Sequence, residues 1–503
     1  MWFPFFVQLM PNTENIAVLL HRKCDNMKKA IIIVIIFNVL RFVFIPLIGL
    51  SPQESYFAYY ADHLSLSYYD HPPLVGYTIW LFMEAFGHNV FAVKFAAFII
   101  TLLAQIAFLA LSSRVLRGER KYLAWVLFCT TMLVTSLSLQ NCPDVVLVLF
   151  WTLSVWALYR AIFNNEKRFW IYAGLLMGLA FDSKFTAFGI PAGLVVFLLF
   201  SGKYRKLLAS PWPYMSILIM LMMGAPILVW NIQNDFVSFR LDSVLRAEPF
   251  DSDTPQNLPQ FALAQIIILM PILFAGLWWL FGKYLWRIIT KPNQTNAEMW
   301  FLFSFFMPTF LGVYLVSIFG EVKYNWLIPT YITGMVMMAR LLNEKWRKWH
   351  WIATVAIHAV AIYLILIGPK SAYVRYDLGL DSKQVAQTVD SIHEVYPEAF
   401  VFATDGYKTA SKVSFYSNYD IYGPQVIDQV PYHFAYVGLD TKQLNGKDGL
   451  LIKPHLNSTT PFHLIRPYFD KVEKIQSIKV AGVVAYDVFY CTDYKGQLQP
   501  AKN

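Results

Sequence analysis

The sequence predicts a polytopic α-helical membrane protein with a small α/β domain at its C-terminal end. Of the 503 residues, 57% are hydrophobic and only 15% are charged, whereas a soluble domain carries about 25% charged residues. Many apolar runs also reach the roughly 20 residues that a helix needs to span a bilayer. After residue 370 the apolar runs become short and are separated by turn residues, which indicates a domain outside the membrane.

The formal net charge of +9 does not indicate a nucleic-acid partner. The positive residues lie mostly in short clusters between apolar runs, as in the cytoplasmic loops of membrane proteins. The cysteines have no paired spacing, so the sequence predicts neither a zinc site nor a disulfide framework. They are Cys24, Cys129, Cys142 and Cys491.

Residues 1–26 are interpreted as a leader or as an upstream extension of the reading frame. From Met27 the sequence MKKAIIIVIIFNVLRFVF has a basic flank followed by an apolar stretch. No small-residue cleavage site follows it, so we expect a retained first span and not a signal peptide.

Apolar runs predict about eleven membrane spans in all. They lie near 30–50, 89–112, 121–139, 143–163, 169–184, 185–202, 211–230, 259–286, 298–319, 326–342 and 349–368. The apolar run 74–87 is left out, because it has only about 14 residues and follows two prolines. It is better suited to a helix lying at the membrane interface.

The distribution of basic residues predicts the orientation of the chain. If 74–87 does not cross, all the basic loops fall on one side together with Lys28 and Lys29, and that side is cytoplasmic. The transmembrane domain is then 27–369 and the outer α/β domain is 370–503, in which SKQVAQTVDSIHEVY predicts an amphipathic helix. The outer face receives 51–88, 140–144, the turn near Lys184, 231–258, 320–325 and everything after 369.

The first outer loop, 51–88, contains candidate catalytic residues. Glu54, Asp70 and His71 are interleaved with tyrosines that include Tyr56. One interpretation is a carboxylate general base, oriented by His71, beside an aromatic platform for a sugar or a lipid headgroup. The alternative is a set of solvated loop acids with an aromatic belt at the membrane interface.

Two further charges lie at the outer ends of apolar runs. Asp144 is a second candidate acid, although an acid at a helix start is also favoured by the helix dipole. Lys184 could bind a phosphate as a point charge, although an ion pair with Asp182 would also explain it. Charges within membrane spans are rare and are often functional.

Two outer segments carry Asn–Trp neighbours, WNIQNDFVSFR at 230–240 and KYNW at 323–326. Their tryptophans are expected as interface anchors. The candidate ligand-binding residues beside them are Asn231, Arg240, Lys323 and Asn325. Arg240 places positive charge on the side where the charge rule disfavours it, which supports a phosphate-binding role.

The order of these segments resembles the family 39 type of GT-C glycosyltransferases, which includes dolichyl-phosphate-mannose protein mannosyltransferases and the aminoarabinose transferase of lipid A. No nucleotide-binding or hydrolase motif is present in a usable context. The matching segments are QESYFA (53–58), YYDHPPL (68–74), CPDVVLVLFW (142–151), SKFTA (183–187), WNIQNDFVSF (230–239), KYNWLIPTY (323–331) and KTASKVSFYSN (408–418).

The resemblance implies a GT-C fold and an inverting transferase of the bacterial inner membrane, with its site and its C-terminal domain in the periplasm. Such an enzyme passes a sugar from a polyprenyl-phosphate carrier to a glycolipid or protein acceptor among membrane lipids. No cofactor is required, and no metal site is predicted, although the acids and His71 could bind a divalent metal.

One position departs from the family pattern. The first acid of the family is Gln53 here, whereas Glu54 is kept. Glu54 is therefore expected to be the catalytic carboxylate, with Asp144 and Asp70 in support. A phosphate acceptor needs little help from a base, so the departure favours lipid A or a related glycolipid over a protein hydroxyl. Reduced activity is another consequence that the departure leaves open.

Other classes of protein are weighed against a transferase. A secondary transporter would have inverted repeats and polar groups at the midplane of the membrane, whereas the polar residues here gather at one face. A non-catalytic membrane protein of glycan assembly is the other alternative, because of Gln53. A protein O-mannosyltransferase-like enzyme is the alternative within the family.

Overall fold

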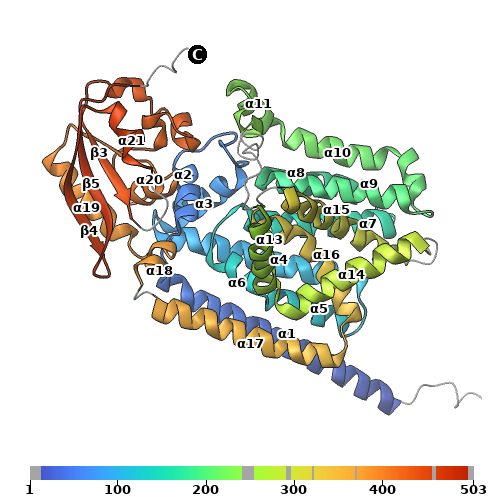
Figure 1. Ribbon diagram of the computed structural model, residues 1–503. Helices are drawn as coiled ribbons and strands as arrows, with labels where there is room; N and C mark the ends of the chain where they lie inside the picture. Colours follow the sequence, from blue (N-terminus) through green and yellow to red (C-terminus); the bar gives the residue numbers. More distant parts are fainter. Residues whose placement is uncertain are drawn as a thin grey trace, which may run out of the picture.

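A computed structural model describes residues 13–240, 254–290, 296–319, 322–368, 371–455 and 460–496. In Figure 1 a bundle of helices stands beside a smaller part built on a β-sheet, and two short helices lie between them. These two helices are α2 (Pro52–Asp62) and α3 (Leu74–Phe86). The smaller part, residues 371–496, is called the C-terminal domain below.

The bundle consists of apolar helices joined mostly by short connections. In chain order they are α1 (Thr13–Phe44), α4 (Val90–Val115), α5 (Arg120–Cys129), α6 (Met132–Leu139), α7 (Pro143–Phe163), α8 (Arg168–Ser183), α9 (Gly189–Phe200), α10 (Pro211–Met223), α11 (Ala225–Gln233), α13 (Thr254–Leu269), α14 (Pro271–Thr290), α15 (Ala297–Phe319), α16 (Ile328–Leu341) and α17 (Glu344–Ile367). Helices α1 and α17 run side by side along one edge, where the rings of Phe37 and His358 are 5.1 Å apart (Figure 1).

Six helices of the described part are long and apolar enough to cross a membrane. Two bent pairs, α5–α6 (52°) and α10–α11 (43°), raise that number to as many as eight. Shorter apolar helices cover Leu74–Phe86, Phe185–Phe200 and Pro259–Leu269. The chain is thus a multi-pass membrane protein, and the total of about eleven spans stays a prediction.

The structure divides three predicted runs between two helices each and locates one predicted boundary inside a helix. The runs 121–139 and 211–230 correspond to the bent pairs α5–α6 and α10–α11. The run 259–286 is divided between α13 and α14 at Met270, whose φ is +71°. Pro271 explains the break, because a proline disfavours helical geometry in the residue before it. The predicted boundary at Met27 lies within the continuous helix α1, and residues 1–12 of the predicted leader lie outside the described residues.

The first outer loop folds into α2 and α3. Ser51 caps α2 in a capping box with Glu54: the Ser51 hydroxyl accepts from the Glu54 N–H, and the Glu54 carboxylate accepts from the Ser51 N–H. Helix α3 begins directly after Pro72-Pro73, because proline fits the start of a helix but not its interior.

The C-terminal domain contains a five-stranded sheet in the order β2-β1-β3-β5-β4. Strands β1 (Phe400–Ala403), β2 (Ile421–Tyr422) and β3 (Gly449–Pro454) are parallel, whereas β4 (Lys471–Val480) and β5 (Val483–Thr492) add antiparallel pairs. The predicted amphipathic helix is α19 (Ser382–Val395), and the remaining helices are α18 (Ala372–Asp377), α20 (Lys408–Ser414) and α21 (Phe462–Ile465).

Two clusters of buried apolar side chains hold the molecule together. One lies inside the helical bundle. The other joins the interior of the C-terminal domain to α2, α3 and the start of α4, through residues such as Tyr56, Tyr60 and Phe434. The first outer loop is therefore packed against the C-terminal domain as well as against the bundle, and the polar residues of that loop lie along the seam between them.

The chain crosses itself closely where the first span meets the C-terminal domain. A Cβ at Gly379 would lie 1.8 Å from the Leu50 carbonyl oxygen, and a Cβ at Gly49 would lie 2.2 Å from the Gly379 carbonyl oxygen. Both neighbours are backbone atoms, which cannot turn away as a flexible side chain can. The φ of Gly379 is +66°, which also favours glycine.

Replacing Gly379 by alanine is therefore expected to destabilise the protein strongly. Gly438→Ala is the matched control, because Gly438 also has a positive φ (+87°) but has open space around its Cα. The control should show only the conformational cost of about 1 kcal/mol, and Gly379→Ala should cost several times more. Apparent unfolding temperatures in detergent would measure both. Equal losses in the two variants would mean that the crossing is not tight.

Candidate functional site

Asp144 and Lys184 form a buried ion pair between two helix ends. Asp144 lies in the first turn of α7, after Pro143, and Lys184 follows the last residue of α8. The Lys184 Nζ is 2.8 Å from each carboxylate oxygen of Asp144. The Asn325 amide donates a third hydrogen bond, of 2.7 Å, to Asp144 Oδ2. Three predicted residues from distant segments thus meet at one point.

Asp70 is held in place by two tyrosines of α2. Tyr60 donates a short hydrogen bond to Asp70 Oδ1, and Tyr56 donates one of 3.3 Å to the same oxygen. Within the described part of the chain, Asp70 Oδ2 has no hydrogen-bond partner, and the residue is only half-buried. Asp70 therefore keeps an oxygen that can accept a proton or bind a hydroxyl.

His71 follows Asp70 in the chain, and its ring contacts Phe57 with centroids 5.4 Å apart. Burial lowers the pKa of His71, the charge of Asp70 opposes this, and the charges of Lys184 and Lys323 add to it. Asp144 acts on the same imidazole. These five predicted residues therefore share one electrostatic environment, and His71 is held in its neutral form.

The predicted cations differ in how accessible they are. Lys323 is exposed and begins the 3₁₀ turn η6 (Tyr324–Leu327), two residues before Asn325. Lys184 is only 6% exposed, and its charge is balanced by Asp144. Arg240 is exposed at the end of a described segment. Among these three, Lys323 has the accessible position next to the site for an anionic ligand.

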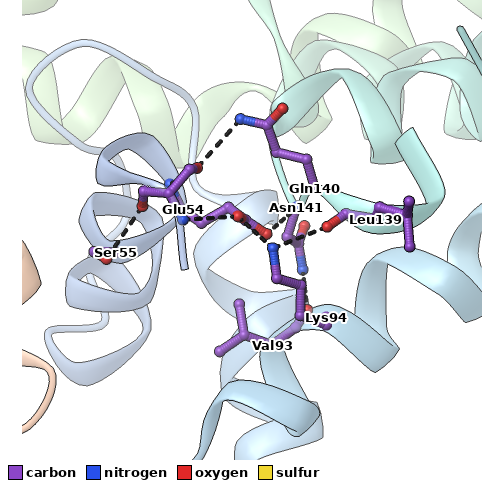
Figure 2. A network of polar contacts seen from close by, with 8 residues as sticks. Glu54, Ser55, Val93, Lys94, Leu139, Gln140 and Asn141 are labelled. Atoms are coloured by element: carbon purple, nitrogen blue, oxygen red, sulfur yellow. Dashed lines mark hydrogen bonds and ion pairs between the residues drawn. The ribbon is translucent and has the colours of Figure 1, made fainter. Parts of the chain in front are cut away.

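Glu54 lies in a different, fully buried network, which Figure 2 shows. Lys94 of α4 donates a 2.6 Å hydrogen bond to Glu54 Oε2 and another, of 2.9 Å, to the Leu139 carbonyl. The Asn141 N–H donates to Glu54 Oε1 at 2.8 Å. Both Glu54 and Lys94 are at most 1% exposed.

This geometry does not support the expectation that Glu54 is the catalytic base. Both oxygens of Glu54 accept hydrogen bonds from protein donors, and the side chain is fully buried. The network instead ties α2 to α4 and to the segment that leads into Asp144. Among the predicted carboxylates, Asp70 has the unoccupied oxygen that a base requires.

Sequence reasoning missed Lys94, although a signal for it was available. Lys94 is a charged residue inside an apolar span, which is rare in membrane helices. Its partner could not be predicted, because Glu54 is 40 residues away and nothing in the sequence pairs them.

Asn231 and Tyr56 have structural partners. The Asn231 side chain donates to the Ile227 carbonyl (3.0 Å) and accepts from the Ser238 N–H (3.2 Å), so it shapes the turn after α11. The Tyr56 hydroxyl accepts from the His433 N–H at 3.0 Å and donates to Asp70. Asn231 therefore does not join the group around Asp144, whereas Tyr56 links that group to the C-terminal domain.

The C-terminal domain also places aromatic residues at the site that the sequence did not indicate. Tyr407 stacks on Tyr56 with ring centroids 4.7 Å apart, and Tyr432 meets Tyr407 edge-on at 5.3 Å. His433 is fully buried against Tyr60 and Tyr68, at centroid distances of 5.1 and 4.8 Å. No local pattern predicts the contacts of Tyr407 and His433 with Tyr56, Tyr60 and Tyr68, because they join segments more than 300 residues apart.

In the described part of the chain, no group of three or more His, Cys, Asp or Glu side chains is arranged to hold a metal ion. The chemistry available from the described residues is that of an accessible carboxylate (Asp70), a neutral imidazole (His71), a paired cation (Lys184) and an exposed cation (Lys323). Such a set can accept a proton and can stabilise a phosphate group.

The fold is that of the GT-C transferases. The structure is similar to that of ArnT from Cupriavidus metallidurans in the apo state, with a TM-score of 0.63 and 13% identity over 92% of this chain and 98% of that one. It is also similar to the same protein bound to undecaprenyl phosphate, with a TM-score of 0.60 and 14% identity over 92% of this chain and 97% of that one.

Sequence comparisons point in the same direction. A family model described as dolichyl-phosphate-mannose-protein mannosyltransferase matches residues 70–230. The chain is 23% identical over 299 residues to the lipid A galacturonosyltransferase RgtD of Rhizobium johnstonii, an alignment that covers 59% of this chain and 61% of the relative. It is 25% identical over 296 residues to the undecaprenyl phosphate-alpha-4-amino-4-deoxy-L-arabinose arabinosyl transferase 2 of Proteus mirabilis, covering 56% of this chain and 50% of the relative.

The resemblance to the family 39 type of GT-C glycosyltransferase is thereby confirmed. The family model begins at Asp70, in the YYDHPPL segment, and ends at Trp230, so it includes Asp144 and Lys184. The chain spans between half and three-fifths of the length of the two curated relatives that it matches.

The Glu54–Lys94 pair predicts a clear effect on stability. Glu54→Gln leaves the Lys94 ammonium buried without its counter-charge, and removing one partner of a buried pair costs about 3–5 kcal/mol. We expect a large fall in the apparent unfolding temperature in detergent, partly recovered when Lys94→Met is added. Asp62→Asn is the control, because its partner His88 is 45% exposed and exposed pairs contribute about 0–1 kcal/mol.

Two outcomes would contradict this structural role. Glu54→Gln might unfold at the temperature of the unaltered protein yet fail in sugar transfer, which would restore Glu54 as the catalytic base. Alternatively, the double variant could be no more stable than Glu54→Gln alone, and the cost would then not arise from an unpaired Lys94.

His433 predicts a pH-dependent attachment of the C-terminal domain. Burial lowers its pKa to about 3, and the charge of His63 adds to this. Because the folded-state pKa lies below the ordinary value of about 6.5, stability is complete above pH 6.5 and is lost as the pH falls toward 3. Between pH 6.5 and 5.5 the loss from this group should be about 1 kcal/mol.

The measurement compares unfolding temperatures at pH 7.5 and 5.5 for the unaltered protein, His433→Phe and the exposed control His463→Phe. The His433 variant should lose part of the pH dependence, and the His463 variant should keep all of it. An unchanged pH dependence in His433→Phe would show that this imidazole is already charged or accessible.

Proposed function

We propose that this protein is an inverting glycosyltransferase that moves a sugar from a polyprenyl-phosphate donor to an acceptor in the bacterial envelope. The observation that carries the proposal is the buried contact of Asp144 with Lys184 and Asn325, near enough to His71 for Lys184 and Asp144 to act on its pKa, in a GT-C fold. The favoured acceptor is lipid A or a related glycolipid.

Donor binding is assigned to the cationic side of the site. The leaving group of a polyprenyl-phosphate sugar is a phosphate, so its departure is favoured by nearby positive charge and hydrogen-bond donors. Lys323 is exposed beside the site, and Lys184 is fixed by Asp144. The similar fold of an ArnT structure bound to undecaprenyl phosphate supports a carrier of this kind.

In this proposal Asp70 activates the acceptor where its nucleophile is a hydroxyl, whereas a phosphate acceptor needs no base. Tyr56 and Tyr60 hold one oxygen of Asp70, and the other oxygen is available to take the proton of an attacking hydroxyl. Neutral His71, the next residue in the chain, orients the groups in the site. Asp144 acts through Lys184 and Asn325, because both of its oxygens are occupied.

Two observations favour a glycolipid acceptor. The curated relative RgtD is named for transfer to lipid A, and Gln53 stands where the family has its first acid. A phosphate acceptor is already anionic near neutral pH and tolerates a weak base. A Ser or Thr hydroxyl depends on a strong one.

We further propose that the protein lies in the inner membrane with its C-terminal domain in the periplasm. This follows from the predicted topology, in which the basic clusters lie on the cytoplasmic side, opposite the site. Asp70, Lys184 and Lys323 would then face the periplasm together with residues 371–496.

Mass spectrometry of lipid A and of envelope glycoproteins, from cells with and without the gene, tests the proposal. A sugar lost from lipid A supports the favoured acceptor, and a sugar lost from a protein supports a mannosyltransferase-like enzyme. No change in either fraction, together with no transfer by the purified protein from a polyprenyl-phosphate donor, would refute the function.

Asp70→Asn distinguishes the two acceptor chemistries in the purified protein. For a hydroxyl acceptor, the loss of a general base should lower kcat by about 10²- to 10⁴-fold. For a phosphate acceptor, kcat should change by only about threefold, because no proton has to be removed in the step. Asp470→Asn is the control, because Asp470 is 57% exposed and pairs with Lys495 in the C-terminal domain.

A further inference from the structure

The loop that follows the carboxyl end of the parallel strand β1 contacts α2. In open α/β sheets, the loops at these ends carry the groups that bind ligands. The loop after β1 contains Asp405, Gly406 and Tyr407, and Tyr407 stacks on Tyr56 of α2. The loop after β1, at the edge of the sheet where ligands most often bind, therefore contacts Tyr56, which donates a hydrogen bond to Asp70.

Tyr432 approaches the same place in an unusual backbone conformation. Its φ is +48°, a left-handed geometry that is uncommon for a bulky residue. Such strain persists only where the surrounding structure enforces it, and it is concentrated at ligand sites. Gly406 also has a positive φ (+72°), and a Cβ there would lie 3.2 Å from the Tyr432 hydroxyl. The two loops are thus fitted closely to each other.

The hydroxyl groups of Tyr407 and Tyr432 are available for binding. Within the described residues, neither has a hydrogen-bond partner, and both rings are half-buried. Burial raises the pKa of both phenols, and the charge of Asp70 adds to this. Both therefore remain protonated and can donate a hydrogen bond beside the Asp70 carboxylate.

The chemistry of this surface fits a saccharide. Sugar rings pack their apolar faces on aromatic rings, while their hydroxyls bind nearby donors and carboxylates. Tyr324, 51% exposed, and Lys323 extend the surface on the bundle side, and Tyr324 lies near enough to act on the pKa of Tyr407. The lysine supplies a cation for an anionic substituent on the same headgroup.

We propose that Tyr407 and Tyr432 bind the saccharide headgroup of a glycolipid acceptor and so make the C-terminal domain a determinant of acceptor specificity. This inference rests on the proposed function and adds the residues that recognise the acceptor. The sugar of the donor is placed on the other side, toward Lys184 and His71.

The test uses the full-length protein in detergent with a polyprenyl-phosphate sugar donor and lipid A as acceptor. Tyr407→Phe and Tyr432→Phe keep the rings and remove only the hydroxyls. Each should raise the KM for lipid A by about threefold to tenfold, the value of one neutral hydrogen bond. The KM for the donor should be unchanged. Tyr373→Phe is the control, because Tyr373 is 53% exposed in α18.

A second measurement does not depend on activity. Equilibrium binding of radiolabelled lipid A, without donor, should weaken by a similar factor in each Phe variant and more in the double variant. Unchanged lipid A binding and an unchanged acceptor KM in the double variant would overturn the inference while leaving the transferase function intact. A rise in the donor KM alone would also overturn it, by assigning the tyrosines to the donor.

The proposed function can fail separately. If the unaltered protein transfers no sugar, the proposed function is refuted, and the binding measurement still decides whether the two tyrosines recognise lipid A. Binding of a Ser/Thr-rich peptide that depends on both hydroxyls, without binding of lipid A, would overturn the assignment of a saccharide acceptor.

Discussion

The buried ion pair between Glu54 and Lys94 is the constraint on which the arrangement of the site depends. It joins α2 to α4, and through the Asn141 N–H it also fixes the segment that enters α7. Helix α2 carries the tyrosines that hold Asp70, and α7 begins with Asp144. One charge pair thus joins the elements that hold the two acidic groups. In a low-dielectric interior such a pair has few alternative geometries, because a shift leaves a charge unpaired.

The site lies on a seam between two parts of the molecule. The second buried cluster contains side chains of the first outer loop and of the C-terminal domain, so the loop cannot rearrange without disturbing both. The Tyr56 hydroxyl accepts from the His433 N–H, and its ring stacks on Tyr407. Rigid aromatic packing is suited to holding polar groups in fixed directions at a membrane surface, where flexible loops would be poor supports.

Much of the fold could be predicted from local pattern. Apolar runs of sufficient length predicted most of the membrane helices, and the amphipathic spacing near 382–396 predicted α19. The double proline at 72–73 predicted the start of α3. The break at Met270 was missed, because the run was judged by its continuous apolar composition and Pro271 was not interpreted as a helix boundary.

The site was predicted less completely. Asp144, Lys184 and Asn325 were predicted from the motifs as site residues. In the structure these three side chains are in contact. Glu54 was the expected base on the strength of its position in the motif, whereas the geometry gives it a buried structural partner. Lys94 was not predicted as a functional or structural residue. Its apolar span was identified by length, and the single charge within the span was not considered.

Local sequence pattern was sufficient to predict that this chain enters a membrane many times and that its C-terminal part differs in composition. These properties follow from local hydrophobicity and charge, which need no partner to be recognised. Only the tertiary structure decided which carboxylate keeps an open oxygen, which cation is already neutralised, and that Tyr407 and Tyr432 reach the site. Those properties depend on contacts between residues tens to hundreds of positions apart, and packing alone selects these contacts from the many that the sequence permits.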